Sequence, residues 1–138
     1  MGSTITEKIL ARAAGRKAVQ PGDMVRARVD LVMAHDVTMP LSILEFRRMG
    51  ATRVFDAGKV VAVSDHFAPA ANVKAAEQIK AVRDFAREQG LEHYFEPGLG
   101  PSGVCHAVLP EEGLVLPGQV ILGADSHTTT YGLSLIHI

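Results

Sequence analysis

The sequence predicts an α/β fold in which helices flank a layered, mostly parallel sheet. Two observations support this prediction. Short apolar runs, rich in β-branched residues and bounded by glycine or proline, recur along the chain and are typical of buried strands. Between them lie longer segments whose apolar residues recur at the spacing of one helix face. Such alternation is typical of parallel strands that are joined by helical crossover connections.

Three segments are predicted to be helical. Residues 4–15 begin with Thr4 and Glu7 at the spacing of a capping box. Residues 41–49 carry apolar side chains at helical spacing. Residues 75–88 have the clearest pattern, because one stripe is apolar and the lysines and arginines lie away from it.

Four segments are predicted to be strands. Residues 24–33 alternate apolar with charged side chains, which is the pattern of a half-buried strand. Residues 59–63 and 119–122 are short, continuous apolar runs of the kind found in buried strands. Residues 93–95 are assigned to a further short strand.

The composition is that of an ordinary globular protein and excludes several classes. Hydrophobic residues make up 47% of the chain and charged residues 21%, so disorder is not expected. The net charge is −1 and the 14 basic residues are scattered, so no nucleic-acid partner is expected. One cysteine cannot form an intramolecular disulfide, and no apolar run reaches membrane-spanning length. We therefore expect a cytoplasmic location and no membrane partner.

Acidic, hydroxyl and imidazole side chains recur where the predicted strands end. The carboxyl ends of parallel strands meet at one edge of a sheet, where ligands bind in open α/β folds. We therefore expect a single cleft in which carboxylates beside imidazoles suit acid–base chemistry. The alternative is that each residue is hydrogen-bonded in a structural turn. The residues concerned are His35, Asp36, Thr38, Asp65, His66, His106, Asp125, Ser126 and His127.

Cys105 lies next to His106, which raises the question of an activated nucleophile. Neighbouring residues of an extended segment point to opposite faces, however, so this pair is badly placed for proton transfer. We therefore expect Cys105 to be a small buried thiol.

Four motifs resemble the opening third of the aconitase superfamily in both order and spacing. They are residues 33–38 (Met-Ala-His-Asp-Val-Thr), 63–69 (Val-Ser-Asp-His-Phe-Ala-Pro), 103–106 (Gly-Val-Cys-His) and 123–128 (Gly-Ala-Asp-Ser-His-Thr). The last motif is the most specific of the four. The resemblance implies that residues 1–132 form the N-terminal part of an aconitase-like cluster-binding domain.

The resemblance implies a hydro-lyase that isomerises a hydroxy acid by dehydration and rehydration over a [4Fe–4S] cluster. One iron of such a cluster acts as a Lewis acid on the substrate. By analogy, Asp65 and His66 would form an acid–imidazole pair that helps to protonate the departing hydroxyl group. His106 would pair with Asp125 beside the cluster and substrate, and His127 would contact the hydroxyl group or an iron-bound water.

The resemblance also implies substrate contacts. Ser126 would hydrogen-bond a substrate carboxylate, and Asp36 and Thr38 would shape the substrate edge. In mitochondrial-type aconitases a substrate-binding glutamine follows the corresponding threonine. Met39 and Pro40 stand there in this chain, which disfavours citrate. The likeness is closest to the family's two-subunit branch, whose substrates are isopropylmalate, in leucine biosynthesis, or homocitrate.

Important parts of the family's machinery are missing from the sequence. Family members hold the cluster with three cysteines that lie far downstream, and Cys105 corresponds to none of them. Because a cluster needs thiolate ligands, we expect no metal ligand within these residues. The substrate-binding arginines are also missing, as is the serine base, which the two-subunit branch carries on a separate small subunit. That small subunit is the expected partner, and we expect this N-terminal fragment to be inactive alone.

Residues 133–138 (Leu-Ser-Leu-Ile-His-Ile) resemble the translated end of a transposon sequencing adapter. The family would continue at this point with a glycine-rich segment of small residues. We therefore expect residues 133–138 to be a non-native tail, in which His137 is not a ligand.

Two other functions stay open from the residues alone. One is a mononuclear metal-dependent hydrolase with Asp65, His66, Asp125 and His127 as its ligands. The other is a non-catalytic subunit or binding module, which predicts a cooperatively folded monomer without an exposed apolar patch. An incomplete enzyme domain predicts the opposite, namely an unpaired sheet edge.

Overall fold

The computed structural model describes residues 2–134, with the backbone alone for residues 133 and 134. Its centre is a parallel sheet of four strands in the order β3-β2-β1-β4, so the predicted α/β fold with a parallel sheet is confirmed. The strands are β1 (Leu31–His35), β2 (Val60–Val63), β3 (His93–Phe95) and β4 (Ile121–Gly123). Most of the predicted tail, including His137, lies outside the described residues.

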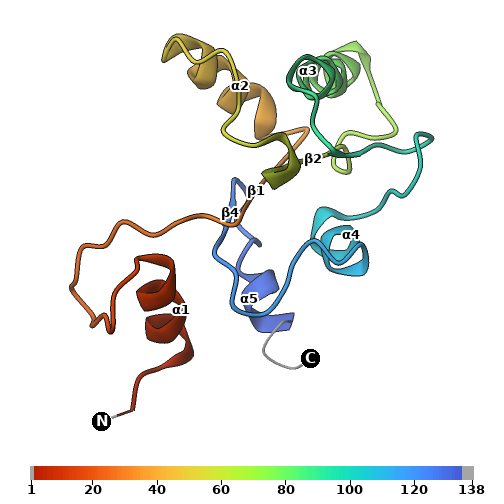
Figure 1. Ribbon diagram of the computed structural model, residues 1–138. Coiled ribbons are helices and arrows are strands. Elements are labelled where there is room, and N and C mark those ends of the chain that lie inside the picture. The colour runs from red at the N-terminus through yellow and green to blue at the C-terminus, as the bar shows by residue number, and fades with distance from the viewer. Residues whose placement is uncertain (1, 135–138) are drawn as a thin grey trace.

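Helices cover both faces of the sheet (Figure 1). They are α1 (Ile5–Ala13), α2 (Met39–Arg48), the 3-10 turn η1 (Ala57–Lys59), α3 (Val73–Gln89), α4 (Cys105–Glu111) and α5 (Thr130–Ser134). The helices α2 and α3 pack against one face, and α4 and α5 pack against the other. Across residues 2–134, every helix is too short or too polar to cross a membrane.

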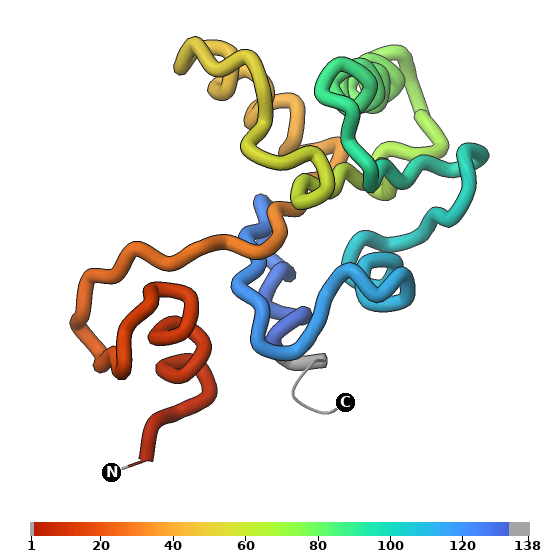
Figure 2. The backbone as a smooth tube through the Cα atoms, viewed as in Figure 1, coloured from red at the N-terminus to blue at the C-terminus, as the bar shows by residue number. Residues whose placement is uncertain are grey.

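The predicted capping box at the start of α1 is confirmed. The hydroxyl of Thr4 accepts a hydrogen bond from the N–H of Glu7 at 3.2 Å, and the Glu7 carboxylate accepts one from the N–H of Thr4 at 2.7 Å. A long extended segment then leads to β1 (Figure 2). Residues 24–30 belong to this segment, so the prediction that they form the first part of a strand is wrong. They alternate like a strand, but β1 pairs with its neighbours only from Leu31 onwards.

The two central strands are buried on both faces, as their apolar sequences require. On one face Met33 and Val61, both fully buried, pack with Leu109 of α4. On the other face Ala62 packs with Phe85 of α3. The sheet is therefore the middle layer of three, and its strands are fixed in register by two separate cores.

The helix α4 differs from the sequence-based expectation, which places Cys105 and His106 on an extended segment. In the structure Cys105 and His106 form the first turn of α4. The carboxylate of Asp65 accepts a hydrogen bond from the N–H of Cys105 at 2.7 Å, which satisfies one of the unpaired donors of that turn. A helix of seven residues that is capped from another part of the chain leaves little local signal. The prediction that Cys105 is a buried thiol is confirmed, because its exposed fraction is 0%.

The strand order reverses between β1 and β4. From β1 the chain passes through α2 to β2 and through α3 to β3 on one side of the sheet, whereas β4 returns to pair with the other side of β1. The helices α2 and α4 that lead to these two sides lie on opposite faces. The neighbouring carboxyl ends of β1 and β4 therefore form a topological switch point, which is where ligands bind in open α/β sheets.

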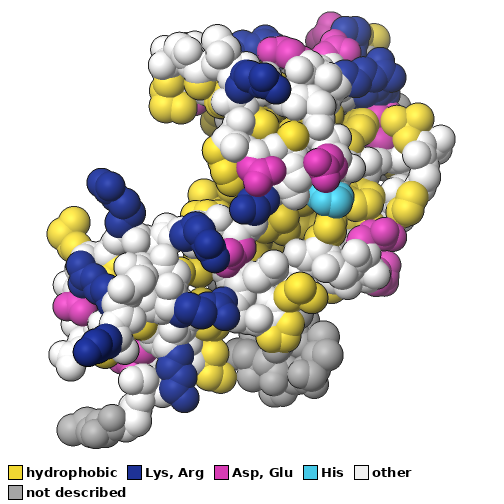
Figure 3. Space-filling view, in the orientation of Figure 1, with side chains coloured by type: hydrophobic (Ala, Val, Ile, Leu, Met, Phe, Trp, Pro, Cys, Tyr) yellow, Lys and Arg dark blue, Asp and Glu magenta, His cyan; other side chains and the backbone are white. Residues whose placement is uncertain are grey.

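Strand β4 pairs on one side only within the described residues, and apolar surface is exposed beside it. Leu122 of β4 is 59% exposed and Phe55 is 64% exposed. A mostly apolar cavity of about 500 Å³ lies between these residues, α2 and α3. Figure 3 shows hydrophobic side chains at the surface between the α2–α3 layer and α4. A free edge with exposed apolar surface matches the incomplete-domain prediction rather than that of a self-contained binding module.

Asp36, which follows β1, holds the end of β1 against the end of β2. Its side chain is fully buried. Its two oxygens accept hydrogen bonds from the backbone N–H of His66, at 3.2 Å, and of Phe67, at 2.8 Å. Bonds from a carboxylate to backbone donors are stronger than neutral ones, so this residue fixes the loop that carries His66.

Replacing Asp36 with asparagine is expected to lower the free energy of unfolding by about 2–3 kcal/mol. The amide keeps one acceptor oxygen but places an NH₂ group against the second backbone donor, which leaves that donor unpaired in a buried position. Urea denaturation at neutral pH measures this loss. Asp56→Asn is the matched control, because Asp56 is an exposed cap for the N–H of Gly58, and asparagine caps about as well. Equal effects of the two substitutions would contradict the role assigned to Asp36.

Candidate acid–base site

Asp125, in the turn after β4, lies at the centre of the site. Its Oδ1 accepts hydrogen bonds from Nε2 of His106, at 2.6 Å, and from the backbone N–H of His127, at 2.8 Å. Its Oδ2 accepts one from Nε2 of His35 at 3.2 Å. The side chain is 9% exposed. One carboxylate therefore connects the end of β1, the first turn of α4 and the turn after β4.

The turn that carries Asp125 requires a glycine at its start. The hydroxyl of Thr128 donates a hydrogen bond to the carbonyl oxygen of Asp125 at 2.7 Å and closes the turn. A Cβ atom on Gly123 would collide with the side chain of Thr128. The spacing of glycine, aspartate and threonine in this motif thus follows from close packing within the turn.

Asp65 and His66 form a second pair in the loop after β2. Nδ1 of His66 lies 2.7 Å from Oδ1 of Asp65, and Oδ2 of Asp65 binds the N–H of Cys105. Asp65 is 5% exposed and His66 is 41% exposed. Because a carboxylate only accepts, Nδ1 of His66 carries the hydrogen and Nε2 is left for other contacts. Both carboxylate–imidazole pairs expected from the family resemblance are therefore present.

His35 connects the two pairs. Its ring stacks on the ring of His66, with centroids 3.9 Å apart and planes inclined by 19°, while its Nε2 binds Asp125. The ring centroids of His106 and His127, which both contact Asp125, lie 6.2 Å apart. The structure thus brings together the four imidazoles that the sequence places at successive strand and loop ends. The sequence places His35 among the polar residues at strand ends but assigns it no catalytic or substrate-binding role; the available signal is its position directly before Asp36.

Hydrogen bonds keep both carboxylates charged. Burial would raise the pKa of Asp125, but the N–H of His127 and the rings of His106 and His35 outweigh it and hold the pKa well below its usual range. Burial likewise opposes ionisation of Asp65, and the N–H of Cys105 together with His66 brings its pKa below the usual value. Each charged carboxylate can therefore orient its imidazole partner and stabilise a proton on it.

His106 has one ring nitrogen without a partner. Its Nε2 donates to Asp125, so Nδ1 is an acceptor, and Nδ1 is buried without a hydrogen bond among the described residues. Leaving such an acceptor unpaired costs about 1–3 kcal/mol. Within residues 2–134 the atom is therefore an unpaired acceptor that is enclosed by the protein and out of contact with solvent.

The other predicted site residues range from exposed to fully buried, with Thr38 half-buried. Ser126 is exposed and His127 is 77% exposed at its side chain, so both can reach a ligand. Asp36 is fully buried, and the hydroxyl of Thr38 accepts a long hydrogen bond, of 3.4 Å, from the N–H of His35. These two residues shape the end of β1 from within, and a direct contact with substrate stays a prediction.

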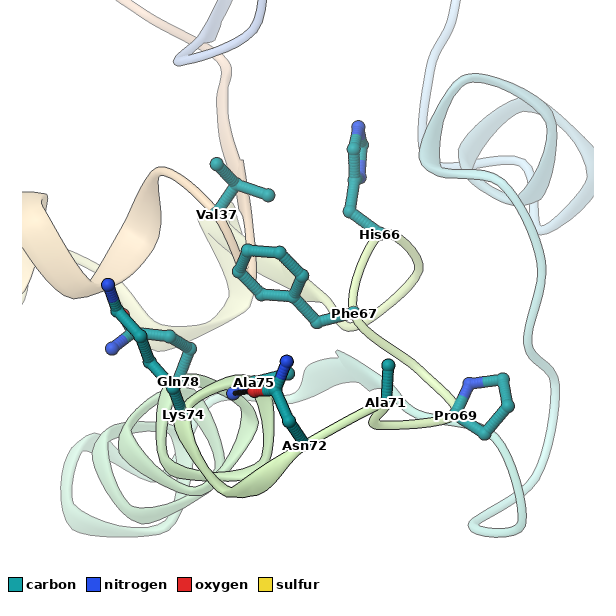
Figure 4. Close-up of a pocket in the computed structure, with 9 residues that line it drawn as sticks. All are labelled: Val37, His66, Phe67, Pro69, Ala71, Asn72, Lys74, Ala75 and Gln78. Carbon is teal, nitrogen blue, oxygen red and sulfur yellow. Dashed lines mark hydrogen bonds between the residues drawn. The ribbon is translucent and has the colours of Figure 1, made fainter.

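A cavity of about 560 Å³ lies beside the site, between the loop after β2 and the start of α3. Figure 4 shows the ring of Phe67 between Val37 and the helix, while the ring of His66 points away from the helix. The cavity is lined by apolar side chains, by His66 and by three polar side chains from the start of α3. The residues are Val37, His66, Phe67, Pro69, Ala71, Asn72, Lys74, Ala75 and Gln78.

The ligand set of the metal-dependent hydrolase is not assembled as predicted. The described residues contain two groups whose ligand atoms lie within 4.8 Å of one another. Asp65 and His66 belong to one group, and Asp125 and His127 belong to the other. Most of the carboxylate oxygens in question already accept hydrogen bonds from N–H groups. The two groups are His35, Asp36, Asp65 and His66, and His106, Asp125 and His127.

The single thiol does not fit an iron–sulfur cluster. Cys105 is fully buried, and burial together with the charge of Asp65 raises the pKa of its thiol to about 12. A cluster requires several thiolates, whereas this thiol stays protonated near neutral pH. The residues of this chain therefore do not hold such a cluster by themselves.

A family model and three similar relatives both point to the aconitase family. Residues 7–135 match the aconitase family (aconitate hydratase). Over 132 residues the chain is 59% identical to the 3-isopropylmalate dehydratase large subunit of Moorella thermoacetica, 53% identical to that of Thermodesulfovibrio yellowstonii and 52% identical to that of Acetivibrio thermocellus. Each match covers 96% of this chain and 31% of the relative, so the chain spans about a third of the relatives' length.

Replacing Asp125 with asparagine is expected to lower the free energy of unfolding by about 2–3 kcal/mol at pH 7. The pKa of Asp125 is lower in the folded than in the unfolded chain, where it is about 3.9. The carboxylate therefore stabilises the fold above that value, and this contribution is lost as the pH falls through the folded-state pKa. The difference between wild type and D125N should thus shrink below about pH 4, as urea denaturation at two pH values can measure.

Glu45→Gln is the control for the loss of one negative charge. Glu45 pairs with Arg48 in an exposed ion pair, with side chains 52% and 65% exposed. Such pairs contribute less than about 1 kcal/mol, so E45Q should change stability little at either pH. A D125N deficit of the same size at both pH values would contradict the hydrogen-bonded carboxylate described above.

Proposed function

The chain belongs to the aconitase family, and we propose that it supplies acid–base residues to a hydro-lyase active site. The proposed reaction is the interconversion of 3-isopropylmalate and 2-isopropylmalate by dehydration and rehydration. The names of relatives that are 52–59% identical support this substrate over homocitrate. The observation that carries the proposal is the meeting of two carboxylate–imidazole pairs, Asp65–His66 and His106–Asp125, near the switch point of the sheet.

The dehydration step requires two proton transfers. The C–O bond breaks and the hydroxyl group leaves as water once it has gained a proton. The electrons of the adjacent C–H bond form the double bond, and that proton goes to a base. We assign protonation of the hydroxyl group to Nε2 of His66, because Asp65 holds Nδ1–H and stabilises the charged ring. Rehydration adds water across the double bond in the opposite sense: the hydroxyl group goes to the carbon that lost the proton, and a proton goes to the carbon that lost the hydroxyl group.

Residues around Asp125 are assigned to substrate binding. The exposed hydroxyl of Ser126 would donate to a substrate carboxylate, and the exposed ring of His127 would contact the hydroxyl group. His106, whose Nε2 donates to Asp125, would hold that carboxylate in place beside them. Asp36 and Thr38 would act by fixing the end of β1 beside these groups.

The rest of the active site is proposed to come from outside these residues. The family implies a [4Fe–4S] cluster, and its thiolates would have to lie elsewhere because Cys105 does not fit that role. The relatives are named large subunits, so we propose a small-subunit partner that provides the base for the C–H proton. We also propose a cytoplasmic location, because the reaction for which the relatives are named is biosynthetic.

A chimeric enzyme tests the proposal. The segment of the Moorella thermoacetica large subunit that matches this chain would be replaced by the matching 132 residues of this chain. We expect the chimera, with its small subunit, to dehydrate 3-isopropylmalate, as followed by the absorbance of the unsaturated product. His66→Asn should lower kcat by about 10²–10⁴-fold, because the proton donor is lost.

His93→Asn provides the matched control. His93 lies at the start of β3, outside the connected imidazoles, so H93N should leave kcat unchanged. A folded chimera that converts homocitrate but not 3-isopropylmalate would favour the alternative substrate. A folded chimera without either activity, or an H66N chimera as fast as its parent, would overturn the proposal.

The 138-residue chain alone is expected to form no iron–sulfur cluster and to have no dehydratase activity. Its one thiol is buried and protonated, so it cannot supply the set of thiolates that a cluster needs. Anaerobic incubation with iron and sulfide, followed by visible absorbance and iron analysis, measures cluster formation. The full-length Moorella relative is the positive control. Absorbance that appears in wild type and disappears in Cys105→Ala would contradict the prediction.

A further inference from the structure

Both ring nitrogens of His35 are engaged, and together they determine its tautomer. The backbone N–H of Val37 lies 3.2 Å from Nδ1 of His35. An N–H group only donates, so Nδ1 must be unprotonated. The hydrogen of the neutral ring is then on Nε2, which donates to Oδ2 of Asp125 at 3.2 Å. The side chain is only 3% exposed, so water does not compete for these bonds.

The bond from His35 restricts the orientation of the Asp125 carboxylate. With Oδ2 occupied, Oδ1 is the oxygen that meets Nε2 of His106 and the N–H of His127. Rotation of the carboxylate would break the bond to His35. The hydrogen on Nε2 of His106 is therefore held by a carboxylate that is itself held from the opposite side.

We propose that His35 is a positioning residue of this site, which as a neutral imidazole protonated on Nε2 orients Asp125 and thereby fixes the tautomer of His106. The inference rests on the proposed function, to which it adds a residue that does not touch the substrate. It assigns His35 no proton transfer, since both of its nitrogens are used within the chain.

Two contacts of His35 argue for the neutral ring. Its ring stacks at 3.9 Å on the ring of His66, the group proposed to carry the proton for the departing hydroxyl. A charged His35 would repel that protonated ring in a poorly solvated position. The N–H of Val37, which points at Nδ1, also excludes a hydrogen there. The carboxylates of Asp125, Asp65 and Asp36 favour a charged ring, so the neutral form of His35 depends on the N–H of Val37 that occupies Nδ1.

Nitrogen-15 NMR of the histidine side chains in the 138-residue chain tests the proposal directly. Long-range proton–nitrogen correlations distinguish Nδ1–H, Nε2–H and charged imidazoles. Near neutral pH we expect His35 to be a single Nε2–H tautomer. We expect the same tautomer for His106, with Nδ1 unprotonated.

Two substitutions separate the two bonds of His35. In His35→Gln the longer amide can still donate to Asp125, so the His106 signals should stay close to those of wild type. In His35→Asn the shorter side chain can still accept from the N–H of Val37 but cannot reach Asp125. The His106 signals in H35N should therefore shift toward those of a mixture of tautomers. His93→Asn, outside the site, is the control and should leave the His106 signals unchanged.

Each outcome decides the proposal. A charged or Nδ1–H form of His35 in wild type would overturn it, and so would a His106 spectrum that is the same in H35N and wild type. Equal changes in H35Q and H35N would indicate a packing role alone and would also overturn it. Should H35N fail to fold, the wild-type tautomer and the H35Q spectrum still decide between these possibilities.

The chimeric enzyme gives a kinetic readout that is separate from the NMR result. We expect H35N to lower kcat by roughly 10–100-fold with little change in KM, as for other residues that orient a catalytic group, and H35Q to restore most of it. An inactive wild-type chimera would count against the proposed reaction alone, because the tautomers are measured without activity. An active chimera with normal kcat in H35N would count against His35 alone.

Discussion

The site depends on one buried carboxylate that accepts hydrogen bonds from three separate parts of the chain. Asp125 receives donors from the end of β1, from the first turn of α4 and from its own turn after β4. A carboxylate at this depth is stable as an anion only because these donors offset the cost of removing it from water. The hydrogen bonds of Asp125 therefore link three features: the pairing of β4 with β1, the position of α4 over the sheet, and the negative charge of the site.

The sheet topology explains why these donors meet. Parallel strands all end at the same edge, and the reversal of strand order between β1 and β4 leaves that edge uncovered between two helical layers. His35 ends β1 and Asp125 follows β4, so their hydrogen bond spans the switch point. The fully buried Asp36 holds the neighbouring loop in place through two backbone donors. Structural and candidate catalytic carboxylates thus alternate along the same edge.

Local patterns were sufficient to predict much of the fold, whereas the two carboxylate–imidazole pairs were expected from the family resemblance. The capping box of α1 and the apolar run of β2 are local features, and both are confirmed. What could not be predicted depends on contacts between distant residues. The helix α4 is capped by Asp65, 40 residues away, and residues 24–30 alternate like a strand but do not pair as one. The tautomer of His35 depends on Asp125, 90 residues away, so no sequence window contains the information.

Asp65 shows why the chain is suited to acid–base chemistry rather than to thiolate chemistry. One of its oxygens orients His66, and the other binds the N–H of Cys105 at the start of α4. The same negative charge adds to burial in raising the pKa of the Cys105 thiol to about 12. A carboxylate that stabilises a proton on an imidazole also disfavours a thiolate beside it, because both effects follow from its charge at short range. Cys105 is therefore unsuited to act as a cluster thiolate, and the imidazoles around Asp65 and Asp125 are the groups that we propose to move and hold protons.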